Sequence, residues 1–194
     1  MKRCLLALSL ALCAAAAAAA PATYELDPNH TQVLAQWSHF GFSNPVANFG
    51  EVDGTLVYDP EDVAASSVQV VLPLSGLQAF VPRFNDHLRS DDFFDAANHP
   101  VVTFRSTRVE AKGEDRLAVT GDLTIKGITR EVVLDVRLNK TGQGSDGRAK
   151  LGFDASTAVK RSDFDLGKFA PNVSDQVDLR ITTEAIVPRA SEQP

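Results

Sequence analysis

Apolar and polar residues alternate along most of the chain, and the pattern is clearest between residues 117 and 138. From Leu117 to Ile125 every second residue is apolar or small, and most of the residues between them are polar. Lys126-Gly127 supplies a turn, and the alternation resumes from Val132 to Leu138. Period-two alternation is typical of a strand with one dry face and one wet face. The segment therefore predicts a β-hairpin whose dry face must be covered.

Similar short runs, separated by turn residues, fill the rest of the chain. The sequence predicts strands at residues 24–26, 32–40, 50–58, 67–74, 101–109, 116–125, 130–138, 148–156 and 176–187, with turns at 27–29, 59–60 and 141–144. The one short helical pattern covers residues 83–90, where Phe84 and Leu88 are four residues apart. This spacing of strands favours an all-β sandwich or barrel. About eight antiparallel strands with one apolar face each can close into a barrel, which removes their exposed edges.

The inward faces of such a barrel are apolar, and several of their positions are small. Leu, Val and Phe there alternate with Ala35, Gly54, Ser106, Gly121 and Ala155. Small residues either leave room for a ligand or accommodate neighbouring aromatic rings, and the pattern alone favours neither. If Ala35 and Gly121 face an open lumen, replacing either with Phe is expected to fill it. Phenylalanines outside the strands, at positions 42, 49, 80, 84, 93, 94 and 169, are placed to cover a barrel mouth.

The first residues predict export. Lys2 and Arg3 precede an uncharged apolar run from Leu5 to Ala20, and small residues around Ala22 suit cleavage before Thr23. We therefore expect a signal peptide at 1–22, one domain at 23–189 and a flexible tail at 190–194. A membrane anchor and a lipoprotein signal using Cys13 are the alternatives. The run is short and alanine-rich for a span, and Leu12 before Cys13 is too large for a lipoprotein signal.

Cysteine content and charge narrow the class of protein. Both cysteines, Cys4 and Cys13, lie in the predicted signal, so the mature chain would hold itself together without disulfides. Without Lys2 and Arg3, 17 of the 19 basic residues remain against 25 acidic ones, a net charge of −8. No basic run follows Arg3. This composition argues against nucleic acid or anionic membranes as partners and suits a bacterial periplasmic protein.

Motifs for metal binding or catalysis are not recognisable in the sequence. The four histidines, at 30, 39, 87 and 99, have no metal-ligand spacing, so no metal site is expected. No G-x-S-x-G motif occurs, and Asp86-His87 beside Ser90 is more simply a solvated helix face. His39 ends a strand and has either a structural role or a ligand contact. Arg161, in RSDF (161–164), either pairs with an aspartate to fix its loop or holds a ligand's polar end.

The order of these segments resembles the YceI-like family of periplasmic polyisoprenoid-binding proteins. The resemblance rests on YELDPNH (24–30), HFG (39–41), GTLVYDP (54–60), DHLRSDDFFD (86–95), HP (99–100), GDLTIKGIT (121–129) and RSDF (161–164). It covers almost all of the predicted mature chain. Family members usually have glycine at the position of Asp165, and a threonine-bearing segment where 76–81 stands. These departures affect loop shape and local ligand contacts more than the fold.

The resemblance implies an eight-stranded antiparallel lipocalin-like barrel, with an elongated apolar cavity that holds an isoprenoid lipid or quinone and no other cofactor. It also implies a homodimer, and no stable membrane insertion. The expected ligand-contacting residues are Val33, Ala35, Trp37, Val52, Leu56, Val70, Leu72, Phe104, Val119, Leu123, Leu134 and Phe153 in the barrel, Phe84, Leu88, Phe93 and Phe94 near its mouth, and His39 and Arg161 for a headgroup.

Two other functions remain open at this stage. One is an enzyme that modifies a lipid or quinone inside the barrel, with Asp86, His87 or Arg161 as its chemical groups. The other is an accessory protein in stress response or quinone-linked redox chemistry that acts through a membrane partner.

Overall fold

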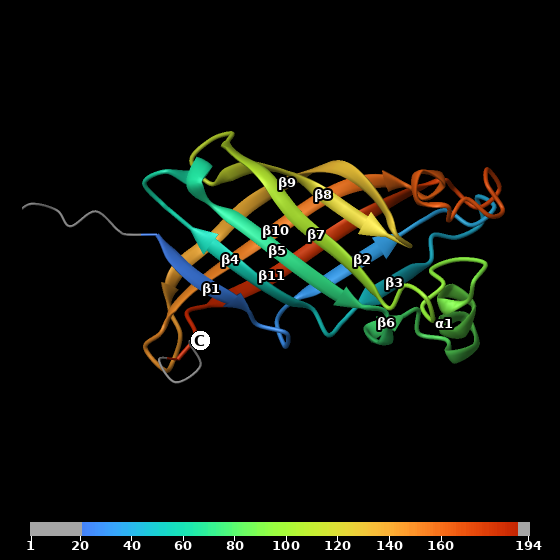
Figure 1. Cartoon of the computed structure of the whole chain (residues 1–194), viewed down its shortest axis with the longest axis horizontal. Coiled ribbons are helices and arrows are strands. Elements are labelled where there is room, and N and C mark those ends of the chain that lie inside the picture. The colour runs from blue at the N-terminus through green and yellow to red at the C-terminus, as the bar shows by residue number, and fades with distance from the viewer. Residues whose placement is uncertain (1–20, 190–194) are drawn as a thin grey trace, which may run out of the picture.

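One antiparallel sheet, closed on itself, makes up most of the molecule (Figure 1). The computed structural model describes residues 21–189, so most of the predicted signal peptide and the predicted tail lie outside the described residues. The strands are β1 (Ala22–Leu26), β2 (Gln32–Gln36), β3 (Val46–Phe49), β4 (Asp53–Tyr58), β5 (Ser67–Pro73), β6 (Leu77–Gln78), β7 (Val101–Ala111), β8 (Arg116–Ile125), β9 (Ile128–Gln143), β10 (Ala149–Lys160) and β11 (Gln176–Ile186).

The barrel has eight long strands, of which the first three are interrupted. β1 leads into β2 through a turn at 27–31, β3 into β4 through 50–52, and β5 into β6 through the 3-10 turn Leu74–Gly76. β11 closes the barrel by pairing with β1 near its end and with β2 near its start. The interruptions at 50–52 and 74–76 touch, since the Gly50 amide donates to the Gly76 carbonyl at 3.1 Å. The predicted all-β barrel is confirmed.

The hairpin read from the sequence is present with its predicted register. β8 spans Arg116–Ile125, and Ile125 pairs with Ile128 across a two-residue turn. Lys126 and Gly127 have φ of 50° and 75°, the left-handed conformation of a type I′ hairpin turn. β9 is longer than predicted and runs to Gln143, so the turn expected at 141–144 was placed too early. The chain reverses at 144–148, where the Gly144 amide donates to the Arg148 carbonyl.

The predicted strands at 32–40 and 50–58 were too long, and two short strands were missed. β2 ends at Gln36, and β4 begins at Asp53. β3 and β6 have four and two residues, too few for alternation to stand out from a loop. The one α-helix among residues 21–189, α1 (Pro82–Arg89), begins one residue before the predicted start, with proline in its first turn. Between residues 21 and 189, no helix has the length and apolar character needed to cross a membrane.

Gly121 faces inward on β8, but the space beside it is already filled. A Cβ at this position would lie 2.5 Å from the Arg105 carbonyl oxygen and 2.5 Å from the Phe104 ring. The condition under which Phe at 121 was expected to fill an open lumen is therefore not met. Gly121 is therefore small because it accommodates an aromatic ring, which is the second of the two explanations given for small inward residues.

Gly121→Ala is expected to lower the free energy of unfolding by about 2 kcal/mol, because Phe104 and the backbone of β7 must move apart. Gly152→Ala is the matched control, since its Cβ would have only Asn139 nearby, at 3.9 Å. Urea unfolding of both variants checks this. Equal stability of the two would show that the contact at Gly121 relaxes freely.

Candidate functional site

The inward faces of the strands enclose an apolar cavity of about 370 Å³. It is lined almost entirely by carbon, because alternate residues of each strand contribute Val, Leu, Ile and Phe side chains. All eighteen residues that the sequence nominated border it. Their contact with a ligand stays a prediction, but the structure does bring them together around one space.

Sequence reasoning missed part of the lining. Ala47 and Leu77 come from the short strands β3 and β6, so no pattern marked them as inward residues. Phe169 and Val173 come from the loop between Phe164 and β11, where residues follow no period. Phe49 and Phe169 were placed at a barrel mouth from composition alone. The structure puts Phe169 there, whereas Phe49 belongs to β3.

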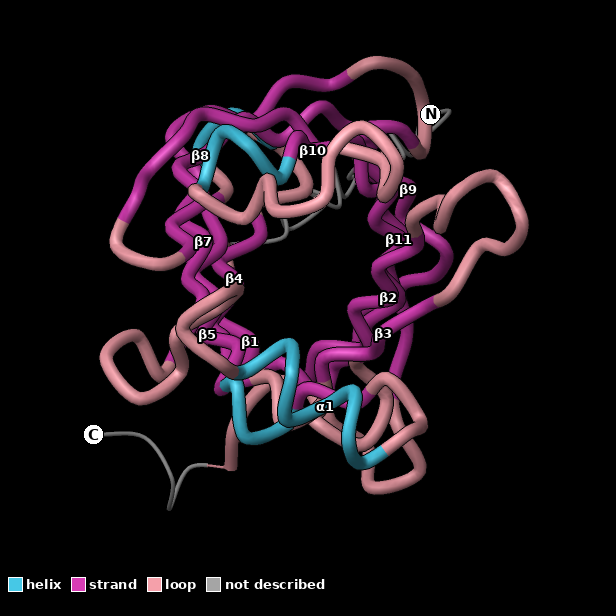
Figure 2. Tube along the Cα trace, turned by 90° about the vertical axis from the view of Figure 1, so that its right-hand side faces the viewer, coloured by secondary structure: helices cyan, strands magenta, loops and turns pink. Residues whose placement is uncertain are grey.

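Three segments border one end of the barrel and form its mouth: residues 37–45, α1 with the turns after it, and residues 161–175. Figure 2 views the barrel from this end, with α1 lying across one side of the ring of strands. The Trp37 ring lies 6.0 Å from the Phe84 ring, and Phe93 lies 6.4 Å from Phe169. His39 bridges to Val173. The mouth is therefore a packed assembly of three segments and not a set of independent loops.

His39 and His87 are titratable residues at this end of the barrel that border the cavity, as does Arg161. Both rings border the cavity, and each packs edge-on against a phenylalanine, His39 on Phe40 and His87 on Phe93. The Ser90 hydroxyl donates to the His87 carbonyl at 2.7 Å, not to its ring. Ser90 and His87 thus do not form a serine–histidine pair of the kind that nucleophilic catalysis requires.

Arg161 is buried under the mouth and donates only to main-chain oxygens. Its guanidinium donates to the carbonyls of Ser174 (2.8 Å), Leu166 (2.5 Å), Lys168 (3.1 Å) and Val173 (2.8 Å). Burial lowers the pKa of this guanidinium, and nearby Asp175 opposes that shift. The fork of donors fits a loop that folds back on itself.

This arrangement corrects two expectations for Arg161. It does not pair with Asp163, which is exposed, and four of its five guanidinium N–H groups bind the main chain, which leaves little of it to hold a ligand's polar end. Asp175 instead binds Ser162, whose amide and hydroxyl donate to it at 2.8 and 2.7 Å. These hydrogen bonds lower the pKa of the Asp175 carboxyl. Arg161 organises the loop that forms one side of the mouth.

Few other polar groups reach the cavity. The hydroxyls of Thr31 and Thr183 lie 2.7 Å apart and satisfy each other. Tyr58 borders the cavity and packs edge-on against Phe153. Burial raises the pKa of the Tyr58 hydroxyl, as do neighbouring Tyr24 and Asp115. The cavity therefore offers apolar surface and almost no charge for recognising a ligand.

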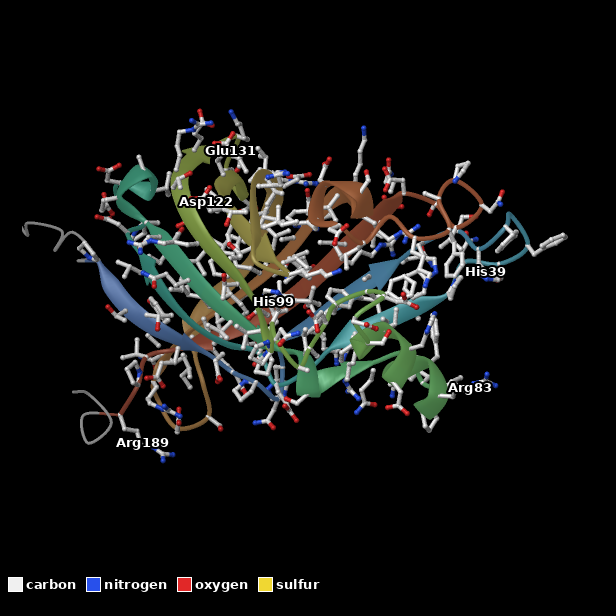
Figure 3. All side chains as sticks on the ribbon, turned by 45° about the vertical axis from the view of Figure 1, so that its right-hand side comes forward. His39, Arg83, His99, Asp122, Glu131 and Arg189 are labelled. Carbon is white, nitrogen blue, oxygen red and sulfur yellow. The ribbon has the colours of Figure 1, made fainter. Side chains whose placement is uncertain are left out.

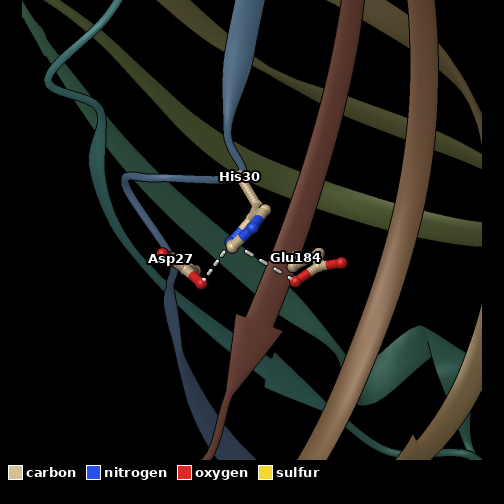
Figure 4. Close-up of side chains that lie close together, drawn as sticks. All are labelled: Asp27, His30 and Glu184. Atoms are coloured by element: carbon tan, nitrogen blue, oxygen red, sulfur yellow. Dashed lines mark hydrogen bonds and ion pairs between the residues drawn. The ribbon is translucent and has the colours of Figure 1, made fainter. Parts of the chain in front are cut away.

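A charged cluster lies outside the cavity, beside the break between β1 and β2 (Figure 4). His30 Nδ1 lies 2.7 Å from Asp27 Oδ2 and 3.6 Å from Glu184 Oε2, and Lys150 also contacts Glu184. Burial raises the pKa of Asp27, but hydrogen bonds from His30 and Asn29 outweigh it, so the pKa is lowered overall. Within residues 21–189 this is the one group with metal-like spacing. The Lys150 ammonium already balances Glu184, so the cluster is explained as ion pairing that ties the 27–31 turn to β11.

Comparison with known proteins places this geometry in a family. A family model described as the YceI-like domain matches residues 24–185. The chain is 36% identical to Protein YceI of Escherichia coli over 191 residues, covering 96% of this chain and 98% of that protein. The crystal structure of Burkholderia cenocepacia BcnA matches with a TM-score of 0.75 and 26% identity, covering 82% of this chain and 98% of that one.

A more distant solved structure shares the fold. It is a polyisoprenoid binding domain from Saccharophagus degradans, implicated in plant cell wall breakdown, with a TM-score of 0.67 and 17% identity. It covers 85% of this chain and 98% of that one. The match of the family model across nearly all described residues, together with the sequence identity to the Escherichia coli protein, shows that this chain belongs to the YceI-like family.

Proposed function

We propose that this protein binds an isoprenoid lipid, a quinone or a polyprenyl chain, in its barrel cavity and performs no chemistry on it. Export by the predicted signal at 1–22 would place it in the periplasm, where it would sequester or carry that lipid. The observation that carries the proposal is the apolar cavity, which the inward faces of the strands line and which has its mouth at α1. The polyisoprenoid-binding name of a structural neighbour supports the same ligand class.

The physical chemistry of such a ligand matches the lining. An isoprenoid chain has almost no polar atoms, so its affinity must come from apolar area removed from water, at roughly 25 cal/mol per Å². Ordering the flexible chain opposes this gain. Polar groups in the cavity add little, because Thr31 and Thr183 bind each other and Arg161 binds its own loop. A lining of this kind selects for length and shape more than for a headgroup.

The two rival functions find less support in the residues around the cavity. An enzyme would need activated groups beside the bound chain. Asp86 is exposed, four of the five guanidinium N–H groups of Arg161 are bound to main-chain carbonyls, and the His87 ring packs on phenylalanines. An accessory protein acting only through a membrane partner would need no cavity, and its barrel would be filled by side chains. The cavity favours the binding function.

Trp37 provides the test, since it is the only tryptophan in the chain and borders the cavity. Titration with a short polyprenol that absorbs no light is expected to change its emission saturably, at one ligand per barrel, and to raise the melting temperature. Trp37→Phe removes the optical signal and should keep the thermal shift. No response in either measurement, with polyprenols or quinones, would overturn the proposal.

A further inference from the structure

Four phenylalanines at the mouth project into solvent. Phe40, Phe42, Phe80 and Phe169 are 49%, 92%, 69% and 52% exposed, and we call them the phenylalanine collar. Phe40 and Phe42 lie in the 37–45 segment, Phe80 lies two residues before α1, and Phe169 lies in the 161–175 segment. Figure 3 marks the same end of the barrel by His39 and Arg83. Large exposed apolar residues gathered at one site indicate a contact surface.

The backbone gives a second, independent indication. Phe40, Phe80 and Phe169 all have left-handed φ, at 54°, 62° and 68°. Glycine or asparagine occupies this conformation at lower cost, and bulky residues there are rare. Each of these positions therefore combines an unfavourable backbone with an unfavourably exposed ring. Strain of this kind is typical of functional sites.

The collar is also held in place by its neighbours. The Phe40 amide donates to the Asn172 carbonyl at 2.7 Å, and the Ser174 amide donates to the Ser38 carbonyl at 2.9 Å. These bonds join two of the three segments that carry the rings. The Lys168 ammonium lies 5.4 Å from the Phe169 ring centroid and also binds Asp92 on the α1 side. The segments that carry Phe40, Phe42 and Phe169 are thus fixed to each other and to the turns after α1.

We infer that the phenylalanine collar inserts into the surface of a lipid bilayer, so that the mouth opens onto the membrane. The purpose of this contact rests on the proposed lipid-binding function, because an apolar cargo could then enter without crossing water. The collar is continuous with the cavity, since Phe169 both borders the cavity and is half exposed. Four exposed rings on three separate segments suit a fluid apolar medium better than a protein face, which needs one complementary surface.

The charged side chains around the phenylalanine collar indicate which kind of lipid bilayer it would enter. Arg83 and Lys168 are exposed basic residues near the mouth, where they are outnumbered by the exposed acidic residues Asp86, Asp91, Asp92, Asp163 and Asp165. Of these, Asp92 is paired with Lys168 and Asp165 with Lys126. Such a surface gains nothing from anionic headgroups, so insertion must be apolar and weakly dependent on salt. A neutral phosphatidylcholine bilayer is the matching surface.

Vesicle flotation tests the inference with the full-length mature protein. The wild type is expected to float with phosphatidylcholine vesicles to the same extent in about 0.05 M and about 0.5 M salt. The double variant Phe42→Ser, Phe80→Asn should bind about tenfold more weakly. Neither residue borders the cavity, and asparagine tolerates the φ of position 80. Val133→Ser, which removes an exposed apolar residue from the outer wall on β9, should float like the wild type.

The Trp37 titration separates this inference from the proposed function. Vesicle binding without a Trp37 response to polyprenol would refute the cavity ligand and leave the collar intact. The inference would be overturned by a wild-type protein that does not float with the vesicles, or by a double variant that floats as well as the wild type. The inference would also be overturned if a collar substitution changed only the oligomeric state of the protein in solution, because a second copy of the chain would then be what covers the collar.

Discussion

Replacing Ala35 with phenylalanine is expected to weaken isoprenoid binding by about a hundredfold while lowering the free energy of unfolding by no more than about 2 kcal/mol. Ala35 lies on β2 opposite Ala47 and Leu179, and its methyl group borders the cavity. A phenyl ring there extends into space that the ligand would otherwise occupy. Because that space is apolar and unfilled, the ring can be accepted without displacing a strand.

Leu34→Phe is the matched control, since its side chain points to the outer face of the same strand and does not border the cavity. It should leave the affinity unchanged. Polyprenol titration followed by Trp37 emission, with urea unfolding of both variants, makes the comparison. Equal affinities of the two variants would mean that the ligand does not occupy the barrel beside β2.

Replacing Arg161 with alanine is expected to lower the free energy of unfolding by about 3 kcal/mol. The substitution leaves four carbonyl oxygens without their donor in a partly buried loop. Arg161→Lys should recover only part of the loss, because one ammonium cannot reproduce the planar fork. Urea unfolding measures the effect, and proteolysis between Arg161 and Gln176 should become faster.

Arg180→Ala is the control for charge, since Arg180 is exposed on β11. It should leave stability within about 0.5 kcal/mol of the wild type. Unchanged stability of the Arg161→Ala variant would favour the alternative in which Arg161 holds a ligand's headgroup. In that case the alanine variant would keep its stability and lose affinity for a lipid with a polar end while binding a plain polyprenol normally.

Much of the fold could be predicted because apolar and polar residues alternate along the strands of the barrel. Alternation gave β8 its bounds and placed Leu123 and Val119 inward, since one face of the sheet is dry along its whole length. The same rule placed Val33 and Phe153 at the cavity. A one-residue error in register would have reversed these faces, so agreement along several strands is a demanding test of the pattern.

The structure of the mouth could be predicted less well from the sequence, for a physical reason. Residues 161–175 have no period, and the role of Arg161 depends on carbonyls up to thirteen residues away, which carry no side-chain signature. β3 and β6 were missed because four and two residues are too few for alternation to stand out from a loop. The sequence left two explanations of Gly121 open because the ring that covers it comes from Phe104, on a neighbouring strand.

Native mass spectrometry of the protein isolated from the cells that make it, followed by organic extraction of what it carries, is the direct test of lipid binding in the barrel. We expect one long isoprenoid or quinone per barrel, lost in Ala35→Phe and retained in Leu34→Phe. A barrel that is isolated empty, and gains no thermal stability from added quinones or polyprenols, would contradict it and favour a protein that acts through a membrane partner.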